Sequence, residues 1–137
     1  MREILFRGKD FSGVINHSWC FGSLDTTEDD RAIIIYLDRF GNKCRIFVNP
    51  ETVGQYTNLK DKNGTKIFEG DIVDVLYDVN YIGVAAERIG VFEVVFHNGC
   101  FMKQKGGVRY HFIPSDKCTV IGNIYDNPEL LEGDGSA

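Results

Sequence analysis

The chain lacks a long apolar segment, paired cysteines and an excess of positive charge, and each absence bears on a class of protein. Nothing in its 137 residues approaches the roughly 18 apolar residues of a membrane-spanning helix, so we expect no membrane segment. A formal net charge of −5 argues against a surface built throughout to neutralise nucleic acid phosphates, although it leaves room for a local basic strip.

The cysteines lie far apart, and none of them belongs to a CxxC pair: Cys20, Cys44, Cys100 and Cys118. Because no secretion signal precedes them, we expect buried, reduced thiols in a cytoplasmic protein. The same compartment sets aside glycosylation at the two Asn-x-Ser/Thr patterns of the sequence.

Glycine and ordinary apolar residues are well represented. Fifteen glycines against three prolines indicate many tight turns, as an all-β chain needs. Hydrophobic residues at 43% and charged residues at 26% are typical of a folded globular protein. We expect one compact domain over 1–131, with an N-terminal β lobe at about 1–60, a second β lobe at about 61–131 and a flexible tail at 132–137.

Short runs rich in β-branched and aromatic residues predict strands at 4–6, 19–24, 32–37, 44–48, 72–77, 91–96, 100–103 and 119–125. Gly41-Asn42 and Asn98-Gly99 tolerate positive φ, so each predicts the tight turn of a hairpin. No apolar stripe with a 3.6-residue period lasts beyond about three turns. Only short helical turns are predicted, at Asn49-Pro50-Glu51 and Asn127-Pro128-Glu129.

The stretch 54–73, GQYTNLKDKNGTKIFEGDIV, contains two turn signals. Asn63-Gly64 after Asp61 fits a tight turn that feeds a strand, because a phosphate-binding loop needs more glycines and an EF-hand loop needs a bidentate Glu at the right distance. Gly70-Asp71 predicts a sharp bend, with Gly70 in a conformation costly for other residues and Asp71 bonding backbone amides of the turn.

Three segments together resemble the YopX family of bacteriophage and prophage proteins: VNPETVGQYTNLKDKNGTKIFEGDIV at 48–73, VIGNIYDNPELLEG at 120–133, and the opening MREILFRGKD. They cover roughly a third of the chain in the order and spacing of the family. Asn49 and Asn58 replace the usual Asp and Gly of the family, and both keep a capping or turn role. Residues 74–118 carry no family motif.

The resemblance implies a mainly β protein with an SH3-like barrel portion, additional β-hairpins and short helical turns. It also implies a phage or prophage protein in the cytoplasm of a bacterial host cell, a tendency to form homo-oligomers, and no known reaction or cofactor. We therefore expect a non-enzymatic oligomeric interaction module, with an unknown phage or host protein as its further partner.

Two places are candidates for partner contacts. Tyr56 stands among polar residues, where it is either a structural anchor or a recognition residue. Tyr81 and Ile82 belong to the apolar segment 79–89, which has no obvious strand partner. This segment either joins copies in a homo-oligomer or covers the open end of the barrel.

The alternative function is nucleic acid binding by the SH3-like lobe. Residues 103–112 interleave cations with aromatic residues on a glycine-hinged turn, and Lys103, Lys105 and Arg109 are the candidate contacts. Because a polar hairpin tip has the same composition and the net charge is negative, we do not favour this function.

Catalytic and metal sites receive less support. The spacing of His97, Cys100, His111 and Cys118 lacks the two paired knuckles of a zinc site, and no Cys-His pair lies in a known nucleophile motif. The acidic run 25–30 is typical of a solvated loop rather than a Mg²⁺ site. We expect no catalytic residue, cofactor or metal.

Overall fold

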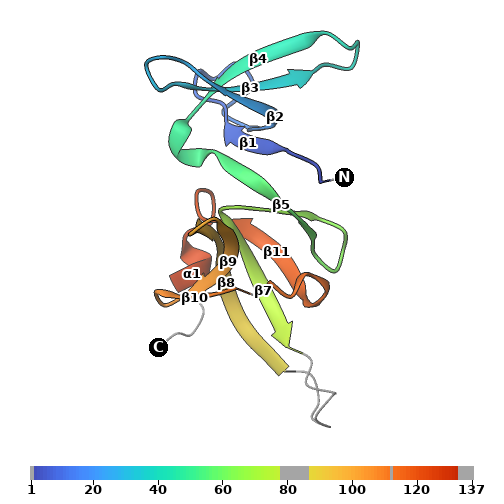
Figure 1. Ribbon diagram of the computed structural model, residues 1–137, viewed down its shortest axis with the longest axis vertical. Helices are drawn as coiled ribbons and strands as arrows, with labels where there is room; N and C mark the ends of the chain where they lie inside the picture. Colours follow the sequence, from blue (N-terminus) through green and yellow to red (C-terminus); the bar gives the residue numbers. More distant parts are fainter. Residues whose placement is uncertain (1, 78–86, 112, 133–137) are drawn as a thin grey trace. The chain divides into compact units, whose positions relative to one another are not determined.

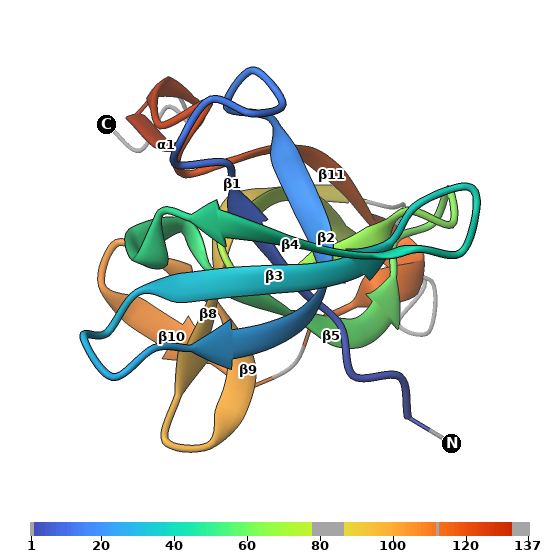
Figure 2. The same cartoon turned by 90° about the horizontal axis from the view of Figure 1, so that it is seen from above.

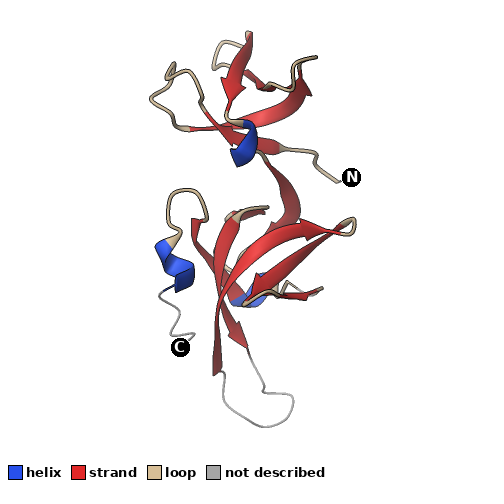
Figure 3. Ribbon diagram, turned by 90° about the vertical axis from the view of Figure 1, so that its left-hand side faces the viewer, coloured by secondary structure: helices blue, strands red, loops and turns tan. Residues whose placement is uncertain are grey.

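The computed structural model describes residues 2–77, 87–111 and 113–132, and strands dominate it (Figure 3). Two antiparallel sheets contain the strands, and the described helices are two 3-10 turns and the short helix α1 (Glu129–Glu132). The predicted mainly β fold with hairpins and short helical turns is confirmed. Within the described ranges neither sheet closes into a barrel.

The chain divides into two compact units, Met1–Tyr56 and Thr57–Ala137. The strands of the first unit pair in the order β4-β3-β2-β1-β5 (Figure 1). In chain order its elements are β1 (Phe6–Lys9), β2 (Trp19–Thr26), β3 (Ala32–Leu37), β4 (Lys43–Val48), the 3-10 turn η1 (Pro50–Thr52) and the start of β5 (Gly54–Lys60). β5 pairs with β1 through Phe6 and Gln55.

Apolar side chains on one face of the strands form the core of the first unit. In β4, Ile46 and Val48 are buried and Phe47 between them faces outward, as the two-residue period of a strand requires. β3 and β4 lie side by side in Figure 2. Gly22 passes so close to β3 that a Cβ there would lie 2.1 Å from the Ile35 carbonyl oxygen, so this position needs glycine.

The second unit begins with the rest of β5 and ends after α1. Its five-stranded sheet has the order β10-β9-β8-β7-β11, and β6 pairs with β5. The elements are β6 (Lys66–Phe68), β7 (Asp71–Tyr77), β8 (Glu87–His97), β9 (Cys100–Lys105), β10 (Val108–Tyr110), the 3-10 turn η3 (Ser115–Lys117) and β11 (Cys118–Asn123). The core packs Ile67 and Phe92 with Val73, Val75 and Val94.

Both predicted hairpin turns are confirmed. Between β3 and β4 the Asp38 carboxylate accepts hydrogen bonds from the amides of Phe40 and Asn42, and Gly41 has a φ of 81°. Between β8 and β9 the turn consists of Asn98 and Gly99, which both have positive φ.

The two turns of the 54–73 stretch also form as predicted. Asp61 Oδ1 accepts from the amides of Asn63 and Thr65, and its Oδ2 accepts from the amide of Val120 at 2.9 Å. Gly70 has a φ of 93°. The carboxylate of Asp71 accepts from the Phe68 amide at 2.7 Å. These two carboxylates therefore accept hydrogen bonds from backbone amides that would otherwise need a carbonyl oxygen of a neighbouring strand.

Some predicted boundaries are wrong. β1 begins at Phe6 rather than residue 4, and β11 ends at Asn123 because the Asn123 side chain accepts from the amides of Tyr125 and Asp126. Strands β5 and β10 were not predicted, since their polar residues hide the alternation. Residues 78–86, which include most of the segment 79–89, lie outside the described residues, as does the tail from 133. β8 begins at Glu87 rather than residue 91 and pairs with β7, so the expectation that 79–89 has no strand partner is wrong for its C-terminal end.

Candidate functional site

The three cations predicted to bind nucleic acid do not share one face of the sheet. Lys103 pairs in register with Val94, so its side chain projects to the core face, where it is only 9% exposed. Its Nζ lies 5.6 Å from the Phe92 ring and 5.3 Å from the Tyr110 ring. This burial lowers the pKa of Lys103.

Arg109 projects to the opposite face. It pairs in register with Gln104, which in turn pairs with Glu93, so these three side chains form a row across β10, β9 and β8. Lys105 stays on the face of Lys103, with its Nζ 5.6 Å from the Phe92 ring. The predicted cationic cluster is therefore split between two faces.

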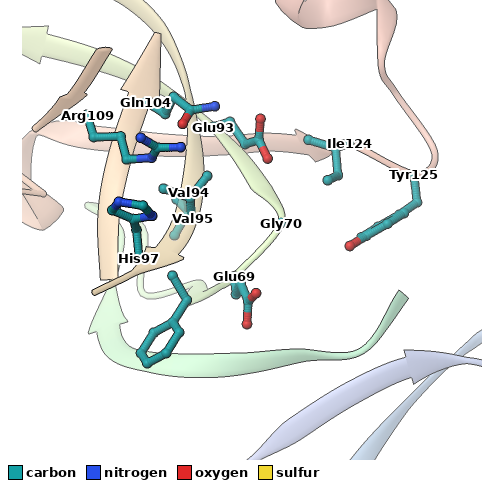
Figure 4. A pocket seen from close by; sticks show the side chains of 11 residues that line it. Glu69, Gly70, Glu93, Val94, Val95, His97, Gln104, Arg109, Ile124 and Tyr125 are labelled. Atoms are coloured by element: carbon teal, nitrogen blue, oxygen red, sulfur yellow. The ribbon is translucent and has the colours of Figure 1, made fainter. Parts of the chain in front are cut away.

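A polar pocket of about 310 Å³ surrounds the row of Glu93, Gln104 and Arg109 (Figure 4). Figure 4 shows the three side chains one after another, with Tyr125 on the far side of the pocket. His97 from the end of β8 and Glu69 from the turn before β7 complete its polar lining. The pocket therefore presents groups of both charges, with no excess of cations for a phosphate.

Glu93 is the unusual group of this polar pocket. Its burial raises the pKa of the carboxyl group, and no described side chain forms a hydrogen bond or an ion pair with it. Glu93 was not among the predicted site residues. The sequence does contain a signal for it, because Glu93 is the one charged residue in the apolar strand run 91–96, VFEVVF, and a charged residue in such a run is unusual.

The first unit carries an aromatic groove of about 260 Å³, which we define by its lining residues: Phe11, Ser12, Arg31, Phe47, Val48 and Pro50. Phe11 is 66% exposed although it is a large apolar residue. The Arg31 guanidinium lies 4.7 Å from the Phe47 ring, and its Nε is 3.1 Å from Asp29. The apolar side chains of this groove were not predicted as a contact site.

A buried carboxylate holds the loop that contains Phe11. Asp10 accepts hydrogen bonds from the amides of Ser12, Gly13, Ile15 and His17. Desolvation alone would raise the pKa of Asp10, but these amides outweigh it and lower the pKa below 3.8. The loop is therefore fixed by its own backbone, which places Phe11 in a defined position.

A second depression, the apolar patch, lies at the other end of β3. Its lining residues, none of them charged, are Ile15, Trp19, Cys20, Phe21, Tyr36 and Leu37. Phe21 and Leu37 are exposed, and the Arg7 guanidinium lies 4.6 Å from the Trp19 ring. Exposed apolar side chains that gather in one place are typical of a contact surface.

The remaining predicted residues do not gather into a site. Tyr56 lies in β5 and is only 4% exposed. This burial favours the role of a structural anchor over that of a recognition residue. Tyr81 and Ile82 lie outside the described residues. Cys20 and Cys118 are buried, whereas Cys44 is half-buried and Cys100 is exposed, so the expectation that all cysteines are buried is wrong for Cys44 and Cys100.

Within the described ranges, no group of three or more His, Cys, Asp or Glu side chains gathers as metal ligands would. The carboxylates of the acidic run are exposed, and Asp25 and Asp29 lie beside Arg45 and Arg31. None of the helices in this part of the chain is long and apolar enough to cross a membrane.

Known proteins with a related sequence or structure complete this description. The crystal structure of protein EF1440 from Enterococcus faecalis is similar, with a TM-score of 0.54 and 24% identity over 96% of this chain and 99% of that one. At this identity the likeness concerns the fold alone. Curated proteins include no significant match. The family described as YopX protein matches residues 6–132, and the chain therefore belongs to the YopX family.

Proposed function

We propose that the protein is a non-enzymatic interaction module that assembles with copies of itself in the cytoplasm of a bacterial host, as a phage or prophage protein. The observation that carries this proposal is the apolar patch of the first unit. Exposed Phe21 and Leu37 lie there beside Trp19 and Tyr36 without a charged residue in the lining. Covering such side chains removes apolar surface from water, which favours association.

The uncharged lining also favours a second copy as the occupant. A two-fold dimer contact joins a patch to the same patch of the other copy, so an apolar lining meets apolar side chains and no charge has to be desolvated. The apolar patch meets this condition, whereas the aromatic groove contains Arg31 and adjoins an acidic turn. We therefore place the self-contact at the apolar patch.

The SH3-like barrel remains part of this proposal. Support comes from the strand order of the second unit, where β11 follows the 3-10 turn η3 and returns to pair with β7. The nucleic acid alternative gains no support from the cations, because Lys103 is buried and Arg109 projects to the other face.

Light scattering coupled to size exclusion tests the proposal. We expect the unmutated protein at micromolar concentration to have a mass of two or more chains of 15.5 kDa. Leu37→Glu places a charge in the patch and should reduce the mass to one chain with an unchanged circular dichroism spectrum.

Val108→Glu is the matched control, because Val108 is also an exposed apolar strand residue and lies outside the patch. A monomer at every concentration would refute self-association, and dissociation by the control alone would refute the location. Salt-sensitive retention of the unmutated protein on single-stranded DNA would favour the nucleic acid alternative instead.

A further inference from the structure

Backbone groups beside the aromatic groove are already paired. The Phe11 amide donates to the Phe47 carbonyl oxygen at 2.9 Å, and the Asn49 amide donates to the Lys9 carbonyl oxygen at 2.8 Å. An isolated bridge joins Asp10 to Val48 between these bonds. An incoming segment therefore finds no free edge at this end of β4 and cannot bind here as an added strand.

What the groove offers a ligand is apolar side-chain surface. Phe11 is exposed on a loop that Asp10 holds in place, while the neighbouring Phe47 ring is stacked against Arg31. Pro50 at the start of η1 forms another part of the lining. Exposed aromatic rings on a fixed scaffold bind other rings and apolar side chains without a large loss of conformational entropy.

The surroundings of the groove are acidic at two places in the sequence. Arg31 ends the turn that carries Glu28, Asp29 and Asp30, all of them exposed, and Glu51 directly follows Pro50. Arg31 is the one cation in the lining, and Asp29 already pairs with it at 3.1 Å. The charge beside the groove is therefore net negative and complements a basic ligand.

We propose that the aromatic groove binds an extended, proline-containing segment of another protein that carries basic residues next to its prolines. A polyproline II segment has no internal hydrogen bonds and needs no strand edge, so its rings can lie on Phe11 and Pro50. The ligand belongs to another protein because this chain has only three prolines, at 50, 114 and 128. This inference goes beyond the proposed self-association and does not rest on it.

Fluorescence anisotropy with labelled synthetic peptides tests the proposal on the full chain. The probe is a peptide of about twelve residues that contains four or so prolines followed by two arginines, and we expect a dissociation constant on the order of 10–100 µM. One comparison peptide has glutamate in place of arginine, and another has glycine in place of proline. Both should bind at least about tenfold more weakly.

Two variants locate the binding. Phe11→Ala removes the exposed ring and should weaken binding of the arginine peptide about tenfold or more. Phe40→Ala is its matched control, because Phe40 is also a largely exposed phenylalanine but lies in the turn after β3, outside the groove. The combined variant Glu28→Gln, Asp30→Asn, Glu51→Gln should weaken binding several-fold at low salt and lose this difference at about 1 M salt.

The proposal is overturned by several results. They are equal binding of the arginine and glutamate peptides, binding that Phe11→Ala leaves unchanged, or no binding at about 1 mM peptide. Equal binding of the glycine peptide would show a general apolar site and would equally reject the polyproline ligand. Phe11→Ala should keep the oligomer mass of the unmutated protein, so a failure here is distinguishable from a failure of the self-association proposal.

Discussion

The two units of this protein share one strand order and use it differently. In each, four strands follow one another across a sheet, a 3-10 turn follows, and a last strand returns to pair with the first. The first unit leaves Phe11 and Phe40 66% and 77% exposed, whereas Val108, at 53%, is the most exposed large apolar side chain described in the second unit. The same arrangement of strands therefore carries exposed apolar side chains in one unit and a polar pocket in the other.

A buried aspartate supports a loop in each unit, but the two carboxylates differ in how far along the chain their hydrogen-bond partners lie. The Asp10 carboxylate accepts hydrogen bonds from amides of the loop that follows it and from the Ser12 hydroxyl of the same loop. Asp61 bonds the turn that follows it and also the amide of Val120, far along the chain. The first carboxylate shapes a local loop, and the second joins a turn to the return strand β11.

The sharpest test of the comparison removes one buried side chain from each core. Ile34 and Ile67 are both fully buried, each in a different unit. Ile34→Ala and Ile67→Ala should each lower the free energy of unfolding by about 2–5 kcal/mol, because each leaves a cavity. Hydrogen exchange should show lost amide protection mainly in the unit that carries the substitution.

Equal loss of protection in both units from either substitution would contradict this expectation. It would show one cooperative domain over residues 1–131, as the sequence analysis expected.

A smaller effect is expected from the carboxylate that reaches β11. Burial by itself would raise the pKa of Asp61, but the amides of Val120, Thr65 and Asn63 outweigh it and hold the pKa below 3.8. A lowered folded pKa gives stability that is present above the unfolded value and is lost as the pH falls through the folded value. Asp61→Asn should lower the Tm by roughly 5–10 °C at pH 7 and by much less near pH 2.

The matched control is Asp116→Asn, an exposed carboxylate of the same unit. Its Tm should stay within about 2 °C of the unmutated value. A Tm loss for Asp61→Asn that is the same at both pH values would show that lost packing, rather than the charge, causes it.

Thiol labelling probes both units without changing their stability. Cys100 is exposed and should react first with iodoacetamide, whereas Cys20 and Cys118 are buried in the first and second cores. Burial, with the charges of Asp61 and Asp116, raises the pKa of Cys118 to about 11, which further slows its reaction. Peptide mapping by mass spectrometry should show Cys118 reacting at least about a hundredfold more slowly than Cys100. Equal rates would contradict a closed second core.

Turn chemistry is the part of this fold that the sequence predicted best. Gly41, Gly64, Gly70 and Asn98 all have the positive φ that their residue types and neighbours indicated. Asp71 bonds the amide of the turn as predicted, because a short carboxylate next to a bend can reach little else.

The surfaces were harder to predict because they depend on register between distant strands. Arg109 stands near Lys103 in the sequence, yet pairing with Gln104 turns it to the other face. Phe11 and Pro50 meet in one groove because Asp10, directly after β1, bridges to Val48 at the end of β4. A single sequence indicates local bends well, but it does not give the pairing that decides which side chains become neighbours.

The last strand of each unit, β5 or β11, also sets an order of folding events. Phe6 of β1 can pair with Gln55 only after β5 has been synthesised, and Asp71 of β7 can pair with Asn123 only after β11 has been synthesised. The pairs from β2 to β4 and from β8 to β10, in contrast, close over short turns. Contacts between distant residues form slowly because loop closure costs entropy before the contact stabilises the chain. Synthesis delivers all strands of the first unit by residue 60, before β7 begins. The strands of the first unit can therefore pair while the second unit is still being synthesised, so the two units need not form their distant contacts at the same time.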